Sequence, residues 1–250
     1  MLAFAEYGNG PAVIFLHGLL GSKANMAGAA RSLAAHRHTF VVDQRNHGDS
    51  FHHPSMTYKT MAADLGGFMD DHDIDNASVV GHSMGGKCAM QFAQSFPERV
   101  DRLVVVDIAP KRYADPDWTA YLQAMMRVDL KTLSSRKEAG GLLENAIPDQ
   151  VYRQFLLSNL EKNGGTYRWK PDLDSIAAAK KALLADVEGP GCEAPTLFIR
   201  GGRSDYIAEK DHDRITQLFP NAEMLCVEEA GHLVHIEARE RFNQILREFL

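Results

Sequence analysis

Cysteine is scarce in this chain of 250 residues: Cys88, Cys192 and Cys226 lie far apart. An odd number of widely spaced cysteines is typical of reduced thiols rather than of a disulfide framework. The sequence also lacks the Cys-x-x-Cys and His-x-x-x-His spacings that hold metal ions. We therefore expect neither a metal site nor an organic cofactor.

Positive charge is not in excess either, because 27 Lys and Arg residues stand against 33 Asp and Glu residues. Without a basic tract, we expect no nucleic-acid partner, and a small-molecule substrate instead. No apolar run approaches the roughly 18 residues that cross a bilayer. Residues 1–8 indicate a short strand rather than a secretory signal, which favours a cytoplasmic location. The sequence carries no signal for an oligomeric state.

What the chain does contain is a regular alternation of apolar runs with helical patterns. Short apolar runs predict strands at residues 11–17, 39–43, 77–81, 100–107, 195–200 and 222–227. Helical patterns between and after them predict helices at 22–35, 58–72, 87–95, 211–219 and 235–250. This alternation is typical of a doubly wound, mostly parallel α/β sheet.

The alternation stops between residues 110 and 190, which we call the cap segment. No β-branched run occurs there, and helices are predicted at 118–127, 136–146, 149–159 and 173–186. We expect an α/β core formed by residues 1–109 and 191–250. Helices inserted at this point usually cover the carboxyl edge of the sheet, where ligands of open α/β sheets bind. The cap segment is therefore expected to be a helical cap.

One motif marks a candidate nucleophile. Residues 81–85 (GHSMG) follow the apolar run 77–81 and precede a helical pattern, which is the setting of a nucleophile elbow. Ser83 would then stand on a sharp turn between strand and helix, exposed to a base and to oxyanion donors. Glycine is needed on both sides because a Cβ there would collide with the closely packed backbone.

A serine nucleophile needs a base and an acid. His232 follows the last predicted strand directly and is the expected base. His235 lies at the start of the last helix, where capping or packing is favoured, and His82 is expected to point into neighbouring structure. For the acid, Asp107 ends one strand and Asp205 follows the next, so both lie at the same sheet edge. The spacing leaves both open.

The remaining site residues would hold the substrate. The backbone N–H groups of Leu19 and Met84 are the expected oxyanion donors, and Leu20 adds apolar wall beside Leu19. Candidates to line an acyl pocket, with ordinary core packing as the alternative, are Trp118, Tyr121, Met125, Met126 and Tyr206. For Lys87 and Arg45, surface solvation or loop bracing is favoured over steering of an anionic leaving group.

Together these motifs resemble the α/β-hydrolase superfamily over nearly the whole chain, and within it the bacterial YbfF-type esterases and their mitochondrial abhydrolase-domain relatives. The resemblance is carried by residues 17–22 (HGLLGS), 43–48 (DQRNHG), 81–87 (GHSMGGK), 107–110 (DIAP) and 231–235 (GHLVH). It implies an α/β-hydrolase fold and favours Asp107 as the acid, since the subgroup uses the Asp of its D-I-A-P segment. The presence of an acidic residue at Asp205 departs from the subgroup.

The expected activity is that of a serine hydrolase that cleaves a carboxylic ester or thioester through an acyl-enzyme. The cap segment has 12 basic and 11 acidic residues and is less acidic than the rest, which is compatible with a coenzyme A thioester. The same scaffold supports carbon–carbon bond hydrolysis, perhydrolysis and lactone hydrolysis. A ligand-binding receptor with slow turnover is the alternative from a different class.

Overall fold

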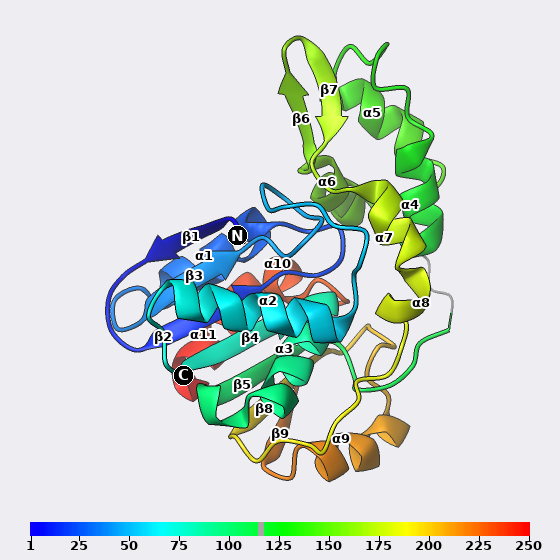
Figure 1. Cartoon of the computed structure of the whole chain (residues 1–250). Helices are drawn as coiled ribbons and strands as arrows, with labels where there is room; N and C mark the ends of the chain where they lie inside the picture. The colour runs from blue at the N-terminus through cyan, green and yellow to red at the C-terminus, as the bar shows by residue number, and fades with distance from the viewer. Residues whose placement is uncertain (115–117) are drawn as a thin grey trace.

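A seven-stranded sheet forms the centre of the computed structural model, which describes residues 1–114 and 118–250 (Figure 1). Its strand order is β1-β3-β2-β4-β5-β8-β9. The strands are β1 (Phe4–Tyr7), β2 (Ala12–Leu16), β3 (His38–Val42), β4 (Ala77–His82), β5 (Val100–Val106), β8 (Thr196–Gly201) and β9 (Ala222–Val227). Only β1 pairs antiparallel, against β3, and the other neighbours pair parallel. The predicted mostly parallel sheet is confirmed.

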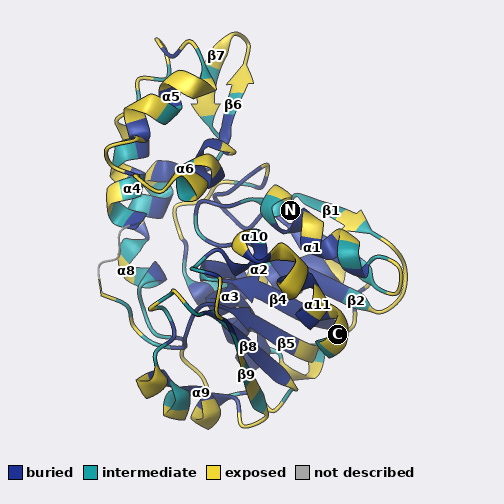
Figure 2. Cartoon of the chain, turned by 180° about the vertical axis from the view of Figure 1, so that it is seen from behind, coloured by how far each residue is buried: buried dark blue, intermediate teal, exposed yellow. Residues whose placement is uncertain are grey.

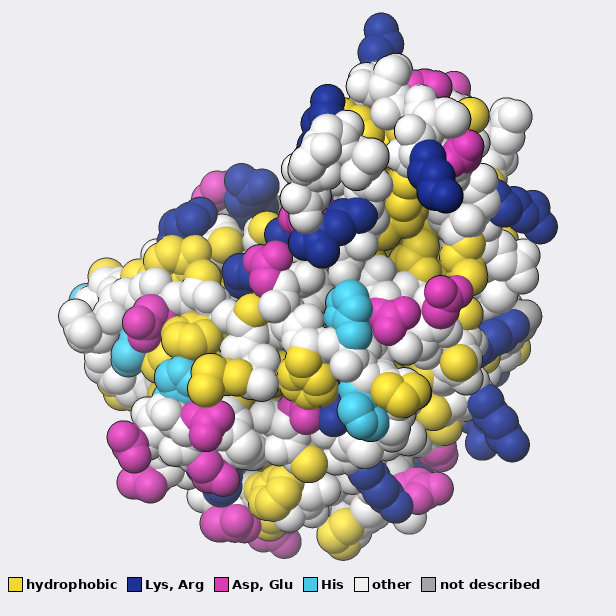
Figure 3. Space-filling model, turned by 45° about the horizontal axis from the view of Figure 1, so that its top comes forward, with side chains coloured by type: hydrophobic (Ala, Val, Ile, Leu, Met, Phe, Trp, Pro, Cys, Tyr) yellow, Lys and Arg dark blue, Asp and Glu magenta, His cyan; other side chains and the backbone are white. Residues whose placement is uncertain are grey.

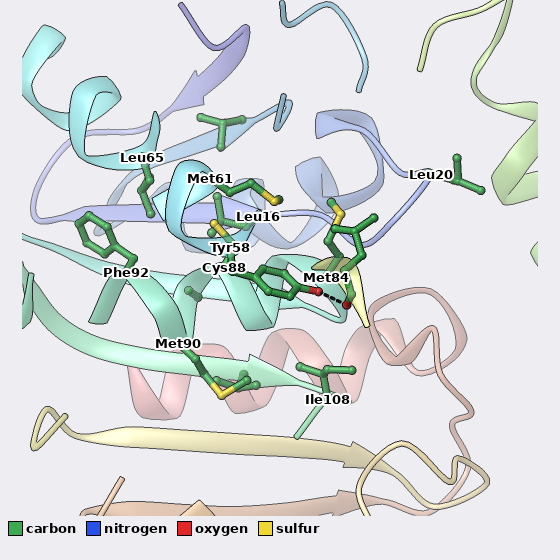
Figure 4. Close-up of a cluster of buried hydrophobic side chains, with 14 of the residues drawn as sticks. Leu16, Leu20, Tyr58, Met61, Leu65, Met84, Cys88, Met90, Phe92 and Ile108 are labelled. Carbon is green, nitrogen blue, oxygen red and sulfur yellow. Dashed lines mark hydrogen bonds between the residues drawn. The ribbon is translucent and has the colours of Figure 1, made fainter. Parts of the chain in front are cut away.

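Helices cover both faces of the sheet, so its central strands are buried on both sides. The helices on one face are α2 (Tyr58–Asp71), α3 (Met84–Ser95) and α9 (His212–Leu218), and those on the other are α1 (Lys23–Leu33), α10 (Val234–Glu237) and α11 (Arg239–Phe249). Consecutive residues of β4 alternate between the two cores: Val79 belongs to the first and Val80 to the second. In Figure 4, Met61 and Leu65 of α2 and Phe92 of α3 lie in the first core. A continuous apolar strand therefore meets apolar helix surfaces on both sides.

The cap segment lies beside the carboxyl ends of the central strands (Figure 1). Its helices are α4 (Trp118–Met126), α5 (Arg136–Leu143), α6 (Gln150–Leu157), α7 (Leu173–Ala178) and α8 (Lys180–Leu183). Among the described residues, none of the helices has both the length and the apolar character that crossing a bilayer requires.

The cap segment also contains strands, at residues 160–169, where the sequence patterns predict neither a helix nor a strand. There, β6 (Leu160–Asn163) and β7 (Thr166–Trp169) form an antiparallel hairpin. Gly164 and Gly165 have φ values of 58° and 94°, the positive values that a tight two-residue hairpin turn requires. The strands have few β-branched residues and are largely exposed (Figure 2), so an apolar run was the wrong signal. The Gly-Gly pair was the informative one.

Two predicted helices are interrupted. The last, predicted over 235–250, is divided at Ala238, whose φ of −128° and ψ of 50° leave the helical region between α10 and α11. The helix predicted over 173–186 is divided at Ala179 and ends at Leu183. Apolar periodicity continues across both breaks, because packing against the core continues while the backbone bends.

Candidate active site

Ser83 occupies the sharp turn between β4 and α3. Its φ of 52° and ψ of −116° are unusual for a residue with a side chain, and such strain is held by surrounding structure at functional sites. A Cβ at Gly81 would lie 2.2 Å from the carbonyl oxygen of Gly85, and one at Gly85 would lie 2.4 Å from that of Leu16. The turn can close only because both positions are glycine.

His232 lies in the loop between β9 and α10 and reaches Ser83. Its Nε2 is 3.0 Å from Ser83 Oγ, and its Nδ1 is 2.7 Å from Asp107 Oδ2. Because the carboxylate accepts the Nδ1–H, Nε2 carries the lone pair that faces the serine hydroxyl. The carboxylate of Glu237 accepts the N–H groups of Gly231 and Leu233 on both sides of the histidine, at 2.9 and 3.0 Å.

Asp107 is completely buried at the end of β5, with a φ of 51°. Besides His232, it accepts the N–H of Gly201 at 2.9 Å and the hydroxyl of Ser204. Asp205, the other acid that the spacing left open, is exposed and makes no hydrogen bond or ion pair with the described residues. The structure brings Asp107, and not Asp205, to the histidine.

Two backbone N–H groups lie beside Ser83 with no acceptor among the described residues, those of Leu19 and Met84. Met84 is the first residue of α3, so its N–H is one of the free donors of a helix N-terminus. The Leu19 loop is held by His47, which accepts the Leu20 N–H at 3.1 Å on Nε2 and donates from Nδ1 to the Arg45 carbonyl. Burial lowers the pKa of His47 to about 3, which keeps the ring neutral and able to accept.

The ring of His82 contacts His232. Its Nε2–H donates to the backbone carbonyl of His232 at 2.8 Å, and its ring centroid lies 4.8 Å from that of His232. The ring of His235 packs against that of His82, with 4.6 Å between the two ring centroids. His235 is buried, and its ring nitrogens have no hydrogen-bond partner among the described residues. Burial lowers the pKa of both rings, so both stay neutral in the folded protein.

Ser83 lines a narrow inner pocket, and a wider outer pocket adjoins it. The inner pocket holds about 40 Å³ and is lined by Leu19, Met84, Tyr58, Lys87 and Ile108, among others. The outer pocket holds about 470 Å³ and includes Arg203 and Asp205. Five side chains line both: Tyr113, Trp118, Tyr152, Tyr206 and His232. Figure 3 shows hydrophobic side chains beside the projecting end of the cap segment, with Lys and Arg side chains standing out around it.

The candidate pocket residues divide into two groups. Trp118 and Tyr206 line both pockets and Tyr121 lines the outer one. Leu20 and Met125 line neither and are buried in the core instead, and Met126 is exposed. Leu20 has a φ of 57°, and its backbone N–H and carbonyl are bound to His47 and Asn159, so its side chain is held away from Ser83.

The inner pocket is also lined by residues that the sequence patterns do not predict there, namely Tyr58, Lys87, Tyr113 and Tyr152. Lys87 is buried rather than solvated, whereas Arg45 braces a loop through its ion pair with Asp64. The helical spacing from Ser83 to Lys87 was a usable signal, since residues four apart share a helix face.

Among residues 1–114 and 118–250, no cluster of three or more His, Cys, Asp or Glu side chains could hold a metal ion.

Comparison with known proteins identifies the family. A model of the alpha/beta hydrolase fold matches residues 11–140, more than half of the chain. The chain belongs to the α/β-hydrolase fold family. This hydrolase is 40% identical over 242 residues to a Danio rerio protein named sn-1-specific diacylglycerol lipase ABHD11, covering 94% of this chain and 76% of that protein.

Other relatives cover nearly the whole of both chains. The hydrolase is 31% identical over 245 residues to Esterase YbfF of Escherichia coli, which covers 98% of this chain and 94% of that protein. A solved structure described as a marine microorganism esterase superimposes with a TM-score of 0.97 at 36% identity, over 100% of this chain and 99% of that one. The resemblance to this family is confirmed, and the protein is an enzyme of the esterase and lipase type.

Proposed function

We propose that this hydrolase cleaves carboxylic esters or thioesters through an acyl-enzyme, with Ser83 as nucleophile, His232 as base and Asp107 as the acid that orients the base. One observation carries the proposal: Ser83 Oγ, the two ring nitrogens of His232 and Asp107 Oδ2 form one chain of contacts of 3.0 and 2.7 Å. A hydroxyl in this arrangement can lose its proton as it attacks.

In the first step, Ser83 Oγ bonds to the acyl carbon while its proton moves to His232 Nε2. The carbonyl oxygen takes up the electron pair and is held by the N–H groups of Leu19 and Met84, which have no acceptor among the described residues. When the tetrahedral intermediate collapses, the bond to the leaving group breaks and that group takes the proton from His232. Water, deprotonated by the same nitrogen, then attacks the acyl carbon. The bond from the acyl carbon to Ser83 Oγ breaks, Oγ takes the proton back from His232, and the free acid leaves.

Asp107 would act by holding His232 in the required tautomer and by stabilising its cation. Asp107 Oδ1 accepts the N–H of Gly201. Oδ2, which contacts His232, also accepts the hydroxyl of Ser204, so the carboxylate has one fixed orientation. The hydrogen bonds from the residues on both sides of His232 to Glu237 also hold the ring in place, because they fix the loop that carries it.

The two pockets suggest how a substrate lies. We assign the acyl group to the inner pocket and the leaving group to the outer pocket, because Ser83 faces the first and the wider space adjoins the ring of His232. The cap segment, as a unit separate from the core, would form the wall opposite Ser83 through Trp118 and Tyr152. The names of the relatives, a diacylglycerol lipase and two esterases, support an ester bond as the one cleaved.

The deciding experiment is Ser83→Ala assayed on a short p-nitrophenyl ester. We expect kcat to fall by a factor on the order of 10⁴ or more, with an unchanged circular dichroism spectrum. Activity near that of the wild type would overturn the assignment of the nucleophile. A chain-length series of acyl esters and acyl-CoA thioesters, measured side by side on the wild type, then distinguishes ester from thioester specificity.

A further inference from the structure

Lys87 is a buried lysine in the wall of the inner pocket. It lies on α3 one helical turn after Ser83, and its backbone N–H donates to the Ser83 carbonyl at 3.1 Å. Only 1% of its surface is exposed, although lysine is almost never fully buried unless it is paired. A cation so close to the reacting centre needs a physical explanation.

The contacts of the Lys87 ammonium are incomplete. Nζ donates to the carbonyl oxygens of Lys111 at 2.7 Å and Ala185 at 2.5 Å. An ammonium has three N–H donors, and among the described residues the third has no acceptor. No carboxylate of the described chain lies within ion-pair distance of Nζ either. The two carbonyls satisfy part of its hydrogen bonding but supply no countercharge.

The groups around Nζ are mostly aromatic or cationic. Nζ lies 4.8 Å from the centre of the Tyr113 ring and 5.5 Å from that of Tyr58, both of which line the inner pocket. Burial lowers the pKa of Lys87 to about 7; Asp186 acts in the opposite direction, and Arg112 and Lys111 add to the lowering. Burial therefore disfavours the charged form of Lys87, and an incoming anion would stabilise that form.

The size of the pocket that Ser83 and Lys87 share limits the ligand. Both residues line the inner pocket, and Lys87 follows Ser83 by four positions at the start of α3. The inner pocket holds only about 40 Å³. A ligand that spans from Ser83 to Lys87 is a small acyl group, not a long chain.

We propose that Lys87 binds a carboxylate at the far end of a short acyl group, so that preferred substrates are half-esters of small dicarboxylic acids. This inference rests on the proposed function and names the substrate class of that site. The carboxylate supplies the third acceptor and the countercharge that Nζ lacks, and Tyr58 and Tyr113 flank the carbon chain between the two ends. A methyl group at the same place would leave the cation desolvated and unpaired.

A purely structural role is the competing explanation. Lys111 lies where the chain leaves the core for the cap segment, and Ala185 lies where it returns, so Lys87 also ties the two crossings together. A structural tie predicts equal losses for all substrates when Lys87 is replaced. An anion-binding residue predicts a loss that depends on the charge of the acyl end.

The test compares monoethyl succinate with ethyl butyrate, which have acyl chains of equal length and differ in a terminal carboxylate against a methyl group. We expect the wild type to prefer monoethyl succinate in kcat/KM by roughly 10- to 100-fold, the range of a hydrogen bond to a charged group. In Lys87→Met the ratio should fall to about 1 or below, chiefly through a higher KM for monoethyl succinate. The control is Lys59→Met, an exposed lysine on α2, which should keep the wild-type ratio.

The outcomes separate the two proposals. If the wild type hydrolyses ethyl butyrate as well as or better than monoethyl succinate, the Lys87 proposal is overturned while the proposed function stands. An unchanged ratio in Lys87→Met overturns it as well. If Lys87→Met fails to fold, the ratio of kcat/KM for monoethyl succinate to that for ethyl butyrate in the wild type still decides whether the Lys87 proposal stands. Hydrolysis of neither ethyl ester also overturns the Lys87 proposal, whereas hydrolysis of the short p-nitrophenyl ester that survives Ser83→Ala rejects the proposed function itself.

Discussion

The phenol ring of Tyr206 lies parallel to the imidazole of His232, with 3.8 Å between ring centroids and 16° between ring planes. Both residues line the inner and the outer pocket. If His232 becomes a cation during catalysis, an aromatic face at this distance stabilises that cation. The stack also fixes the plane of the ring between Ser83 and Asp107.

We therefore expect Tyr206→Leu to lower kcat by about 3- to 10-fold, the value of one aromatic contact. Tyr206→Phe keeps the ring and should keep most of the activity. Steady-state kinetics on one short ester measures both. Equal losses in the two variants would assign the effect to the hydroxyl instead of the stack.

The choice of acid predicts a large asymmetry between two aspartates. Asp107→Asn should lower kcat by roughly 10³- to 10⁴-fold, because an amide at this position favours the wrong tautomer of His232. Asp205→Asn should stay within about twofold of the wild type, because Asp205 is exposed and binds none of the described residues. Comparable losses in the two variants would mean that the role is shared.

The elbow predicts opposite effects of the same substitution at two helical glycines. In Gly85→Ala, the new Cβ would lie 2.4 and 2.6 Å from the carbonyl oxygens of Leu16 and His17, so we expect a loss of about 3 kcal/mol or more in the free energy of unfolding. In Gly28→Ala, on α1, the Cβ meets nothing within 4 Å. That variant should gain up to about 1 kcal/mol from helix propensity. Urea denaturation compares them.

His235 predicts how stability depends on pH. Burial, with His232 and Arg239 adding to it, lowers the pKa of His235 to about 3 in the folded protein. The unfolded chain takes up the proton near pH 6.5, so stability is retained above that pH and lost as the pH falls toward 3. One such group changes the free energy of unfolding by about 1 kcal/mol per pH unit in that window.

His235→Leu should therefore flatten the decline in stability between pH 6.5 and 5 that the wild type shows. Leucine removes a ring that has no hydrogen-bond partner among the described residues, so stability at pH 7 should not fall. The control is the exposed His36→Gln, which should follow the wild-type curve. Urea titrations at several pH values measure all three. Parallel curves for wild type and His235→Leu would contradict the expectation.

Much of this protein follows from local sequence. The apolar runs and the helical patterns between them predict the parallel sheet, since a strand buried on both faces must be apolar at every position. The Gly-x-Ser-x-Gly motif predicts the bend at Ser83, because the backbone contacts of Gly81 and Gly85 exclude any side chain. The position of His232 after the last strand predicts it as the base, and the structure brings its ring to Ser83.

Tertiary structure alone decided the remaining features, because each depends on contacts between distant residues. Asp107 and Asp205 end at the same sheet edge, and only the path of the loop after β8 exposes one of them while the other meets His232. Lysine is ordinarily a surface residue, and Lys87 is buried where the two ends of the cap segment, at Lys111 and Ala185, present carbonyl oxygens to it. Sequence patterns record which surfaces avoid water, and they do not record which polar atoms from distant segments finally face one another.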